Sequence, residues 1–223
     1  MNNISKSELR KKIRAEARNP DSEYRKNASS VIQSKVIESV EFLNSESVFI
    51  YVSTDSEPET GLIIRKALEA GKNVYVPKCT GKTEMKAVRI ESTDELVSGY
   101  MGIKEPAHDG PTADRIDLSV IPCMAASSDG ARLGHGAGFY DRFLSNTDTF
   151  KMCLCFGRNI YDDIPMSEND IKMDKVITES EGKHDRIINL PHHVSENRPH
   201  LSAEERAAQF SSFNALKGTD DEI

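Results

Sequence analysis

Long hydrophobic runs are absent from this sequence of 223 residues. No stretch approaches the roughly 18 apolar residues that a membrane-spanning helix needs. The first segment, MNNISKSELRKKIRAEARNP, also lacks the apolar core of a secretory signal. Hydrophobic residues make up 37% of the chain and charged residues 29%, as in soluble globular proteins. We therefore expect no membrane partner and one domain with a substantial core.

An excess of positive charge is absent too. The chain has 29 Lys and Arg residues against 36 Asp and Glu residues, a formal net charge of −7. Nonspecific binding to nucleic acid needs clustered positive charge that displaces counterions, so this balance argues against a nucleic-acid partner. It does not exclude a local site for an anionic ligand, because Arg132 and Arg142 flank a glycine-rich segment and basic residues crowd the N-terminal segment.

Cysteines are few, and their spacing fits neither a disulfide framework nor a zinc site. Cys153 and Cys155 form a C-x-C pair with no second pair elsewhere, so we interpret them as small buried residues of a strand. Reduced thiols and the missing secretory signal favour a cytoplasmic protein. A mitochondrial presequence is disfavoured, because Glu8 and Glu16 interrupt the basic N-terminal stretch.

Alternating helix and strand patterns predict an α/β fold, specifically a three-layer α/β/α sandwich with a mostly parallel sheet. A strand–helix–strand unit over residues 47–78 implies parallel pairing with a right-handed crossover. This domain would occupy residues 1–190, and a polar tail poor in aliphatic residues, 191–223, would be mobile. The predicted helices cover 6–18, 22–40, 58–71 and 140–144, and the predicted strands 47–52, 73–78, 84–90, 117–122, 151–157 and 174–180.

The segment ARLGHGAGFYDRF, residues 131–143, follows a predicted buried strand. Ligands of open α/β sheets bind beyond the carboxyl ends of strands, and closely spaced glycines let backbone N–H groups converge on an anion. Arg132 would add hydrogen bonds to phosphate, and Asp141 would suit Mg²⁺ beside a nucleotide. The pattern is neither a P-loop nor a dinucleotide-binding motif. Spacing alone leaves two interpretations open: a phosphate cradle, or a tight loop over packed aromatic rings.

The longer pattern GARLGHGAGFYDRFL, residues 130–144, resembles the signature of the 5-formyltetrahydrofolate cyclo-ligase family, G-x-R-L-G-x-G-x-G-Y-Y-D. Further segments resemble that family in the same order, so that the resemblance covers about residues 5–180. It implies a fold similar to sugar-phosphate isomerases and CoA-transferases, and conversion of 5-formyltetrahydrofolate (folinic acid) to 5,10-methenyltetrahydrofolate with MgATP. The further segments are KSELR (6–10), EPET (57–60), GIKEP (102–106) and MDKVITE (173–179).

The resemblance also implies roles for individual residues. Lys6 and Arg10, on one face of a helix, would contact ATP phosphates, and Asp141 and Asp174 would bind Mg²⁺. No covalent nucleophile is implied, so no catalytic residue is named. The remaining ATP contacts would come from Arg132, Leu133, Gly134, His135, Gly136, Ala137, Gly138, Phe139 and Tyr140. The folate contacts would come from Val52, Glu57, His135, Gly136, Ala137, Gly138 and Phe139.

Some positions depart from the family's pattern. Where the family reads P-G-x-A-F-D, this chain has Cys123, Ala126 and Ser127 in place of its glycine, phenylalanine and aspartate, and Phe139 replaces the first tyrosine of the signature. These departures leave open whether the protein is kinetically competent. The sequence also leaves open the role of the tail and any preference for polyglutamated folates. A non-catalytic folate- or nucleotide-binding protein is the main alternative, and a sugar-phosphate isomerase, needing neither ATP nor Mg²⁺, is another. We favour the cyclo-ligase, as a cytoplasmic monomer.

Overall fold

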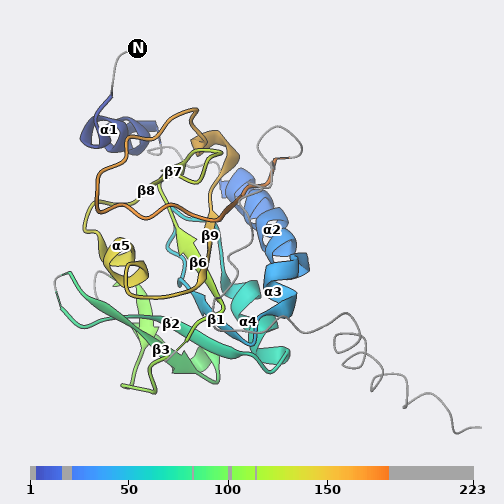
Figure 1. Ribbon diagram of the computed structural model, residues 1–223. Helices are drawn as coiled ribbons and strands as arrows, with labels where there is room; N and C mark the ends of the chain where they lie inside the picture. Colours follow the sequence, from blue (N-terminus) through green and yellow to red (C-terminus); the bar gives the residue numbers. More distant parts are fainter. Residues whose placement is uncertain (1–3, 17–21, 82, 100–101, 114, 181–223) are drawn as a thin grey trace, which may run out of the picture. The chain divides into compact units, whose positions relative to one another are not determined.

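The computed structural model of the protein describes residues 4–16, 22–81, 83–99, 102–113 and 115–180 (Figure 1). The predicted tail, 191–223, lies outside these residues. The α-helices are α1 (Lys6–Glu16), α2 (Ser22–Glu38), α3 (Val40–Asn44), α4 (Gly61–Glu69) and α5 (Phe139–Leu144), with 3₁₀ helices η1 (Thr93–Glu95) and η3 (Gly157–Asn159). The strands are β1 (Ser47–Ile50), β2 (Asn73–Cys79), β3 (Met85–Ile90), β4 (Leu96–Ser98), β5 (Lys104–Pro106), β6 (Leu118–Pro122), β7 (Ala125–Ala126), β8 (Arg132–Leu133), β9 (Phe150–Leu154) and β10 (Lys175–Ile177).

Six strands form the central sheet in the order β10–β9–β6–β1–β2–β3. Neighbouring strands are parallel except β2 and β3, which pair antiparallel with Val76 opposite Val88. Parallel strands are covered on both faces and read as continuous apolar runs. Val48, Phe49 and Ile50 of β1 are accordingly all buried. The predicted mostly parallel sheet is confirmed.

The predicted strand–helix–strand unit is β1–α4–β2. Val48 in β1 pairs in parallel with Val74 in β2. At the start of α4 the hydroxyl of Thr60 donates a hydrogen bond to the carbonyl of Tyr51 over 2.7 Å, which ties the helix to the end of β1. Gly71 takes a left-handed φ of 70° after the helix, a conformation that glycine adopts readily. The chain thus turns back into β2 at the residue the sequence indicated.

Helices cover both faces of the sheet, with α2, α3 and α4 on one side and α5 on the other (Figure 1). Alternate residues of β1 point to the two sides because side chains alternate along a strand. Val48 packs with Ile32 of α2 and Ala67 of α4, whereas Phe49 packs with Leu144 of α5. This arrangement confirms the predicted α/β fold class. The finer similarity to sugar-phosphate isomerases and CoA-transferases stays a prediction.

Several short elements differ from the prediction. The helix predicted over 22–40 stops at Glu38, because Ser39 has extended backbone angles (φ −70°, ψ 145°) and its side chain caps α3 by accepting a hydrogen bond from the Phe42 N–H. The strand predicted over 47–52 ends at Ile50. The hairpins β4–β5 and β7–β8 were not predicted, since strands of two or three residues carry too little periodicity to detect.

Two predictions from composition can be compared with the structure. Cys153 and Cys155 lie buried at the carboxyl end of β9 and beyond it, which confirms their interpretation as core residues. Among the described helices, none is both long and apolar enough to cross a bilayer.

Candidate functional site

The hairpin β7–β8 supports the glycine-rich loop. It follows β6 and pairs Ala125 with Leu133 and Ala126 with Arg132. Ala126 and Ser127, which depart from the family's pattern, are fully buried in it. The Ser127 N–H donates to the carbonyl of Ala131 over 2.9 Å and closes the turn. These departures therefore have a structural role in the described chain.

Helix α1 packs against this hairpin. Leu9 and Ile13 are buried in one cluster with Ala125, Ala131 and Leu133. An isolated helix of this length is marginal in water, so this apolar contact holds α1 in place. Because the side chain of Leu133 is buried in this cluster, only the backbone of Leu133 can contact a ligand.

The loop Gly134–Gly138 then runs from the hairpin into α5. Gly136 and Gly138 have positive φ angles of 110° and 68°, which side chains other than hydrogen rarely permit. A Cβ atom at Gly134 would lie only 3.3 Å from Nη1 of Arg132, so close packing also favours glycine there. The Nε of Arg10 in α1 donates to the carbonyl of Gly134 over 2.8 Å. The predicted juxtaposition of Arg10 with the glycine loop is therefore present.

Arg132 ties the end of β6 to the first turn of α5. Its side chain is only 3% exposed, and it donates from Nη1 to the carbonyl of Pro122 over 3.1 Å and from Nη2 to Oδ1 of Asp141 over 2.8 Å. The guanidinium also lies 5.8 Å from the ring centre of Tyr140. The hydrogen-bonding edge that the sequence analysis assigned to phosphate thus holds Asp141 in this structure.

Tyr140 packs below the loop as well as beside Arg132. Its ring meets the Phe49 ring edge-on, with 6.4 Å between centroids, and contacts the clusters on both faces of the sheet. Burial, with the nearby Glu57 carboxylate adding to it, raises the pKa of Tyr140 well above its usual value, so its hydroxyl stays protonated. The packing of Tyr140 was one of the two interpretations that spacing had left open.

Glu57 and His135 meet across the site from different elements. Glu57 lies in the loop after β1 and is 7% exposed. It accepts hydrogen bonds from the N–H and the hydroxyl of Thr54, each with a donor–acceptor distance of 2.9 Å. His135, on the glycine loop, places Nε2 3.5 Å from Oε1 of Glu57. Burial alone would raise the pKa of Glu57, but the hydrogen bonds from His135 and Thr54 outweigh it and lower that pKa. Glu57 is thus a buried, ionised acceptor beside the loop.

Lys6 has a partner that the sequence analysis did not identify. Its ammonium forms an ion pair with Asp170 and donates to the Ser167 hydroxyl over 3.1 Å. Burial raises the pKa of Asp170, but the Lys6 hydrogen bond and the Ser167 N–H outweigh it, with a smaller contribution from Arg132, so the pKa is lowered overall. No motif marks Asp170, since more than 160 residues separate it from Lys6.

The two predicted metal ligands have different partners. Oδ1 of Asp141 is held by Arg132 and lies 3.4 Å from the Ile171 N–H, while Oδ2 of Asp174 accepts from the Lys151 N–H over 2.7 Å and lies 3.0 Å from the Lys151 ammonium. No group of three or more His, Cys, Asp or Glu side chains among the described residues is arranged to hold a metal ion. Each carboxylate nevertheless keeps its second oxygen without a partner in the part of the chain that the structure describes.

The remaining predicted contacts lie around the loop. Val52 is half-buried and packs against the cluster that contains β1. Phe139 is half-buried, with the Arg142 guanidinium 6.0 Å from its ring centre, and the Ala137 carbonyl accepts a hydrogen bond from Arg142. Arg142 therefore supports the shape of the loop from its far side.

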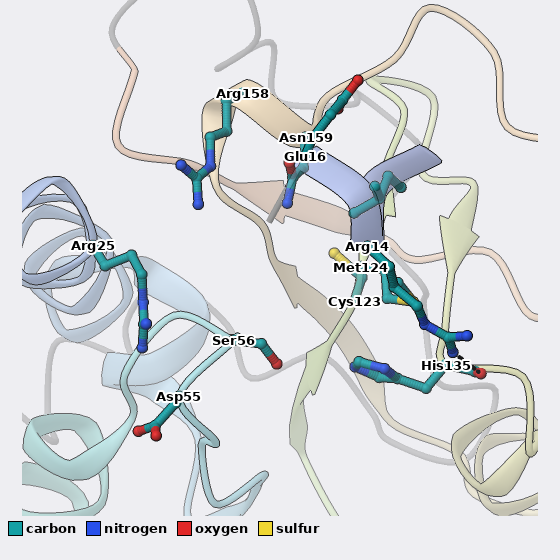
Figure 2. A pocket seen from close by; sticks show the side chains of 11 residues that line it. Arg14, Glu16, Arg25, Asp55, Ser56, Cys123, Met124, His135, Arg158 and Asn159 are labelled. Carbon is teal, nitrogen blue, oxygen red and sulfur yellow. Dashed lines mark hydrogen bonds between the residues drawn. The ribbon is translucent and has the colours of Figure 1, made fainter. Parts of the chain in front are cut away.

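A cavity of about 500 Å³ lies beside the loop (Figure 2). This volume suits a ligand of the size of a small cofactor. Six segments line it, so only the folded chain brings them together. Its lining residues are Ile13, Arg14 and Glu16 of α1, Arg25 of α2, Asp55 and Ser56 after β1, Cys123 and Met124 after β6, His135 of the glycine loop, and Arg158 and Asn159 of η3.

Comparisons with known proteins show which family the chain resembles. Residues 2–179 match the sequence model of the 5-formyltetrahydrofolate cyclo-ligase family. A Caenorhabditis elegans protein named a probable 5-formyltetrahydrofolate cyclo-ligase is 37% identical over 196 residues, which cover 79% of this chain and 93% of that relative. An Arabidopsis thaliana protein named 5-formyltetrahydrofolate cyclo-ligase, mitochondrial, is 30% identical over 207 residues, covering 79% of this chain and 73% of the relative.

A solved structure has the same fold. The NMR structure of Aquifex aeolicus 5,10-methenyltetrahydrofolate synthetase superposes with a TM-score of 0.73 and 29% sequence identity, and covers 86% of this chain and 100% of that chain. The resemblance seen in the sequence is confirmed, and an enzyme is favoured over a non-catalytic binding protein. The chain belongs to the 5-formyltetrahydrofolate cyclo-ligase family and is a ligase of that type.

Proposed function

We propose that this protein converts 5-formyltetrahydrofolate to 5,10-methenyltetrahydrofolate in a reaction that consumes ATP, requires Mg²⁺ and releases ADP and phosphate. The observation that carries this proposal is the position of the glycine loop between α1 and Glu57. Arg10 holds the loop at Gly134, and His135 of the same loop, which lines the cavity, reaches Glu57. One loop thus adjoins both a basic helix and a buried acceptor.

The chemistry asks the protein mainly for positioning and charge stabilisation. The formyl oxygen attacks the γ-phosphorus of ATP, and ADP leaves. N10 then attacks the activated formyl carbon, loses its proton, and closes the five-membered ring as the oxygen departs with phosphate. Phosphoryl transfer of this kind depends on cations and backbone N–H groups that stabilise developing charge, and it needs no covalent nucleophile.

In this proposal the phosphates lie at the glycine loop. The backbone N–H groups of residues 134–138 and the guanidinium of Arg10 would bind phosphate oxygens, with Lys6 as a second cation. Phosphate would compete with Asp170 for the Lys6 ammonium, because these two now form an ion pair. Arg132 would act through Asp141, whose orientation it holds.

Asp141 and Asp174 suit Mg²⁺ by their donor chemistry. Magnesium in nucleotide sites takes one or two carboxylates and completes its coordination with phosphate oxygens and water. Oδ2 of Asp141 and Oδ1 of Asp174 are the oxygens that would hold it. When bound, Mg²⁺ would neutralise charge that develops on the transferred phosphoryl group.

The folate would occupy the cavity with its pterin toward Glu57 and Val52. The pterin ring presents N–H donors, and the lowered pKa of Glu57 keeps its buried carboxylate ionised, so that it can accept charge-assisted hydrogen bonds from them. His135 and the rest of the glycine loop would then separate the pterin from the phosphates.

An absorbance assay tests the function directly. Purified protein mixed with folinic acid and MgATP should produce the near-ultraviolet band of methenyl-folates, and the band should need both ATP and Mg²⁺. Asp141→Ala should abolish it. A flat trace from folded protein that still binds ATP would favour the non-catalytic alternative. Turnover of a sugar phosphate without ATP or Mg²⁺ would favour the isomerase.

We also propose a cytoplasmic monomer that acts on small molecules without nucleic acid or membrane. The formal charge of −7 supports the absence of nucleic acid. Because the Arabidopsis relative is named mitochondrial, the cellular location of this protein has to be measured directly. Light scattering of the purified chain and fractionation of its native cells would test the two assignments.

A further inference from the structure

The cavity carries positive charge that the proposed chemistry does not use. Its lining includes three arginines, Arg14, Arg25 and Arg158, against two acids, Glu16 and Asp55. Figure 2 shows Arg25 and Arg158 on one side of the cavity and Arg14 and His135 on the opposite side. His135 contacts Glu57, and Arg25 and Arg158 lie across the cavity from His135.

Arg25 is the more unusual of these two arginines. It is half-buried on α2, and its Nε is buried with no hydrogen-bond partner among the residues that the structure describes. A buried donor on a charged group is costly when unpaired, because it has given up water without replacement. Within those residues no carboxylate forms an ion pair with the guanidinium, although Asp55 lines the same side of the cavity. A ligand carboxylate would supply both the missing acceptor and the counter-charge.

Stacking holds Arg158, which has no ion pair with any residue in the described part of the chain. Its guanidinium lies 4.7 Å from the Tyr24 ring centre and 5.7 Å from that of Phe156. Stacking fixes the plane of a guanidinium while leaving its N–H edge for a planar anion. Arg158 is exposed, so it stands at the solvent side of the cavity.

We propose that Arg25 and Arg158 bind the carboxylates of the substrate's glutamate tail. This inference rests on the proposed function, because a reduced folate carries its pterin at one end and its glutamate carboxylates at the other. With the pterin at Glu57, the tail extends toward the two arginines. Arg25 takes a carboxylate of the first glutamate, and exposed Arg158 meets the tail where it leaves the cavity.

Removing the glutamate from the substrate tests this assignment. The analogue that ends at the p-aminobenzoyl group should have a KM roughly tenfold or more above that of 5-formyltetrahydrofolate. Arg25→Gln should raise the KM of the complete substrate about tenfold, leave that of the truncated analogue unchanged, and preserve kcat and the KM for ATP. Arg158→Gln should have a smaller effect, a few-fold, because water screens an exposed charge.

Lys26→Gln is the matched control. It removes one positive charge from the neighbouring, exposed position of α2, outside the cavity lining, and should change neither KM. Circular dichroism and thermal melts would establish that each variant folds. If Arg25→Gln raises the KM of both substrates equally, or of neither, the assignment of Arg25 to the glutamate tail is overturned.

A binding measurement separates this inference from the proposed function. p-Aminobenzoylglutamate should bind the wild-type protein more tightly than p-aminobenzoate does, and Arg25→Gln should remove that difference. If the protein turns over no folate yet discriminates in this way, the proposed function fails and the anion site stands. If it catalyses the reaction without this discrimination, the function stands and the anion site falls.

Discussion

Arg132 joins the sheet to helix α5 through two hydrogen bonds from one guanidinium. Its partners are the Pro122 carbonyl at the end of β6 and the Asp141 carboxylate in α5. Lysine can place a positive charge there but cannot direct two bonds from a planar fork. The geometry of this residue therefore matters more than its charge.

Arg132→Lys should lower the free energy of unfolding by about 1–3 kcal/mol, because a buried acceptor loses its donor. It should also reduce turnover, since Asp141 loses its orientation. Denaturant unfolding and steady-state rates measure the two effects. Arg65→Lys, at an exposed position of α4, is the control and should stay within about 0.5 kcal/mol of wild type. A stable and fully active Arg132→Lys would remove the positioning role.

Glu57 is proposed to accept hydrogen bonds from the pterin. Glu57→Gln keeps the size of the side chain but replaces one oxygen by a donor and removes the charge. The KM for folate should rise about tenfold, as expected for loss of a charged hydrogen bond, while the KM for ATP stays within about twofold. Equilibrium binding of each ligand alone would check this result. Stronger loss of ATP binding would refute the assignment.

At the scale of single residues, the sequence predicts some contacts between side chains of the site and misses others. Its motifs assign Arg10 and the glycine loop to one ATP site, because each segment resembles a motif of the same family. Asp170 and Arg25 carry no motif, since their neighbours come from distant segments that only the folded sheet brings together. The sequence also assigns Arg132 to phosphate, whereas in the structure it holds Asp141.

Among the elements, the start of β1 depends on Asp117. One carboxylate oxygen accepts hydrogen bonds from the Glu46 N–H, the Ser47 N–H and the Ser47 hydroxyl, at 2.9–3.0 Å. Asp117 immediately precedes β6, so these bonds align the first residues of two parallel strands. Burial raises the pKa of Asp117, but these hydrogen bonds outweigh it, with a smaller contribution from Arg115, and the pKa is lowered overall.

Asp117→Ala should therefore destabilise the protein by about 1–3 kcal/mol at neutral pH. The folded pKa lies below the unfolded value of about 3.9, so the carboxylate's stabilisation is complete above that value. It is lost as pH falls through the folded pKa, and the difference between variant and wild type should shrink there. Urea unfolding at several pH values measures this trend, with Asp94→Ala, at an exposed position of η1, as control. A pH-independent difference would contradict the role of ionisation.

Elements were predictable where periodicity was strong. The unit β1–α4–β2 has a clear apolar run, a helical face and a closing glycine, so its parts could be placed from residues alone. The hairpin β7–β8 could not, because its residues are small and its strands are two residues long. The order of the strands could not be predicted either. Strand β6 pairs with both β1 and β9, and no local sequence pattern encodes these pairings.

At the scale of the whole molecule, the proposed ATP site joins segments that are far apart in the chain. Helix α1 contacts the glycine loop through Arg10, and a second segment through Lys6 and Asp170. A ligand that binds only when these segments are together stabilises the folded state by mass action. The site should therefore be visible in the unfolding transition of the entire protein.

MgATP at about a hundred times its Kd should add roughly 2.7 kcal/mol to the free energy of unfolding. For a domain of this size that corresponds to a rise in Tm of about 5–10 °C. Chelating Mg²⁺ should reduce the rise, and Asp141→Ala should make it insensitive to Mg²⁺, because the variant lacks the proposed ligand. Lys66→Ala, at an exposed position of α4, should keep the complete shift. If ATP raises the Tm equally with and without Mg²⁺ in the wild type, the phosphates bind without the metal, and Asp141 serves only as the partner of Arg132.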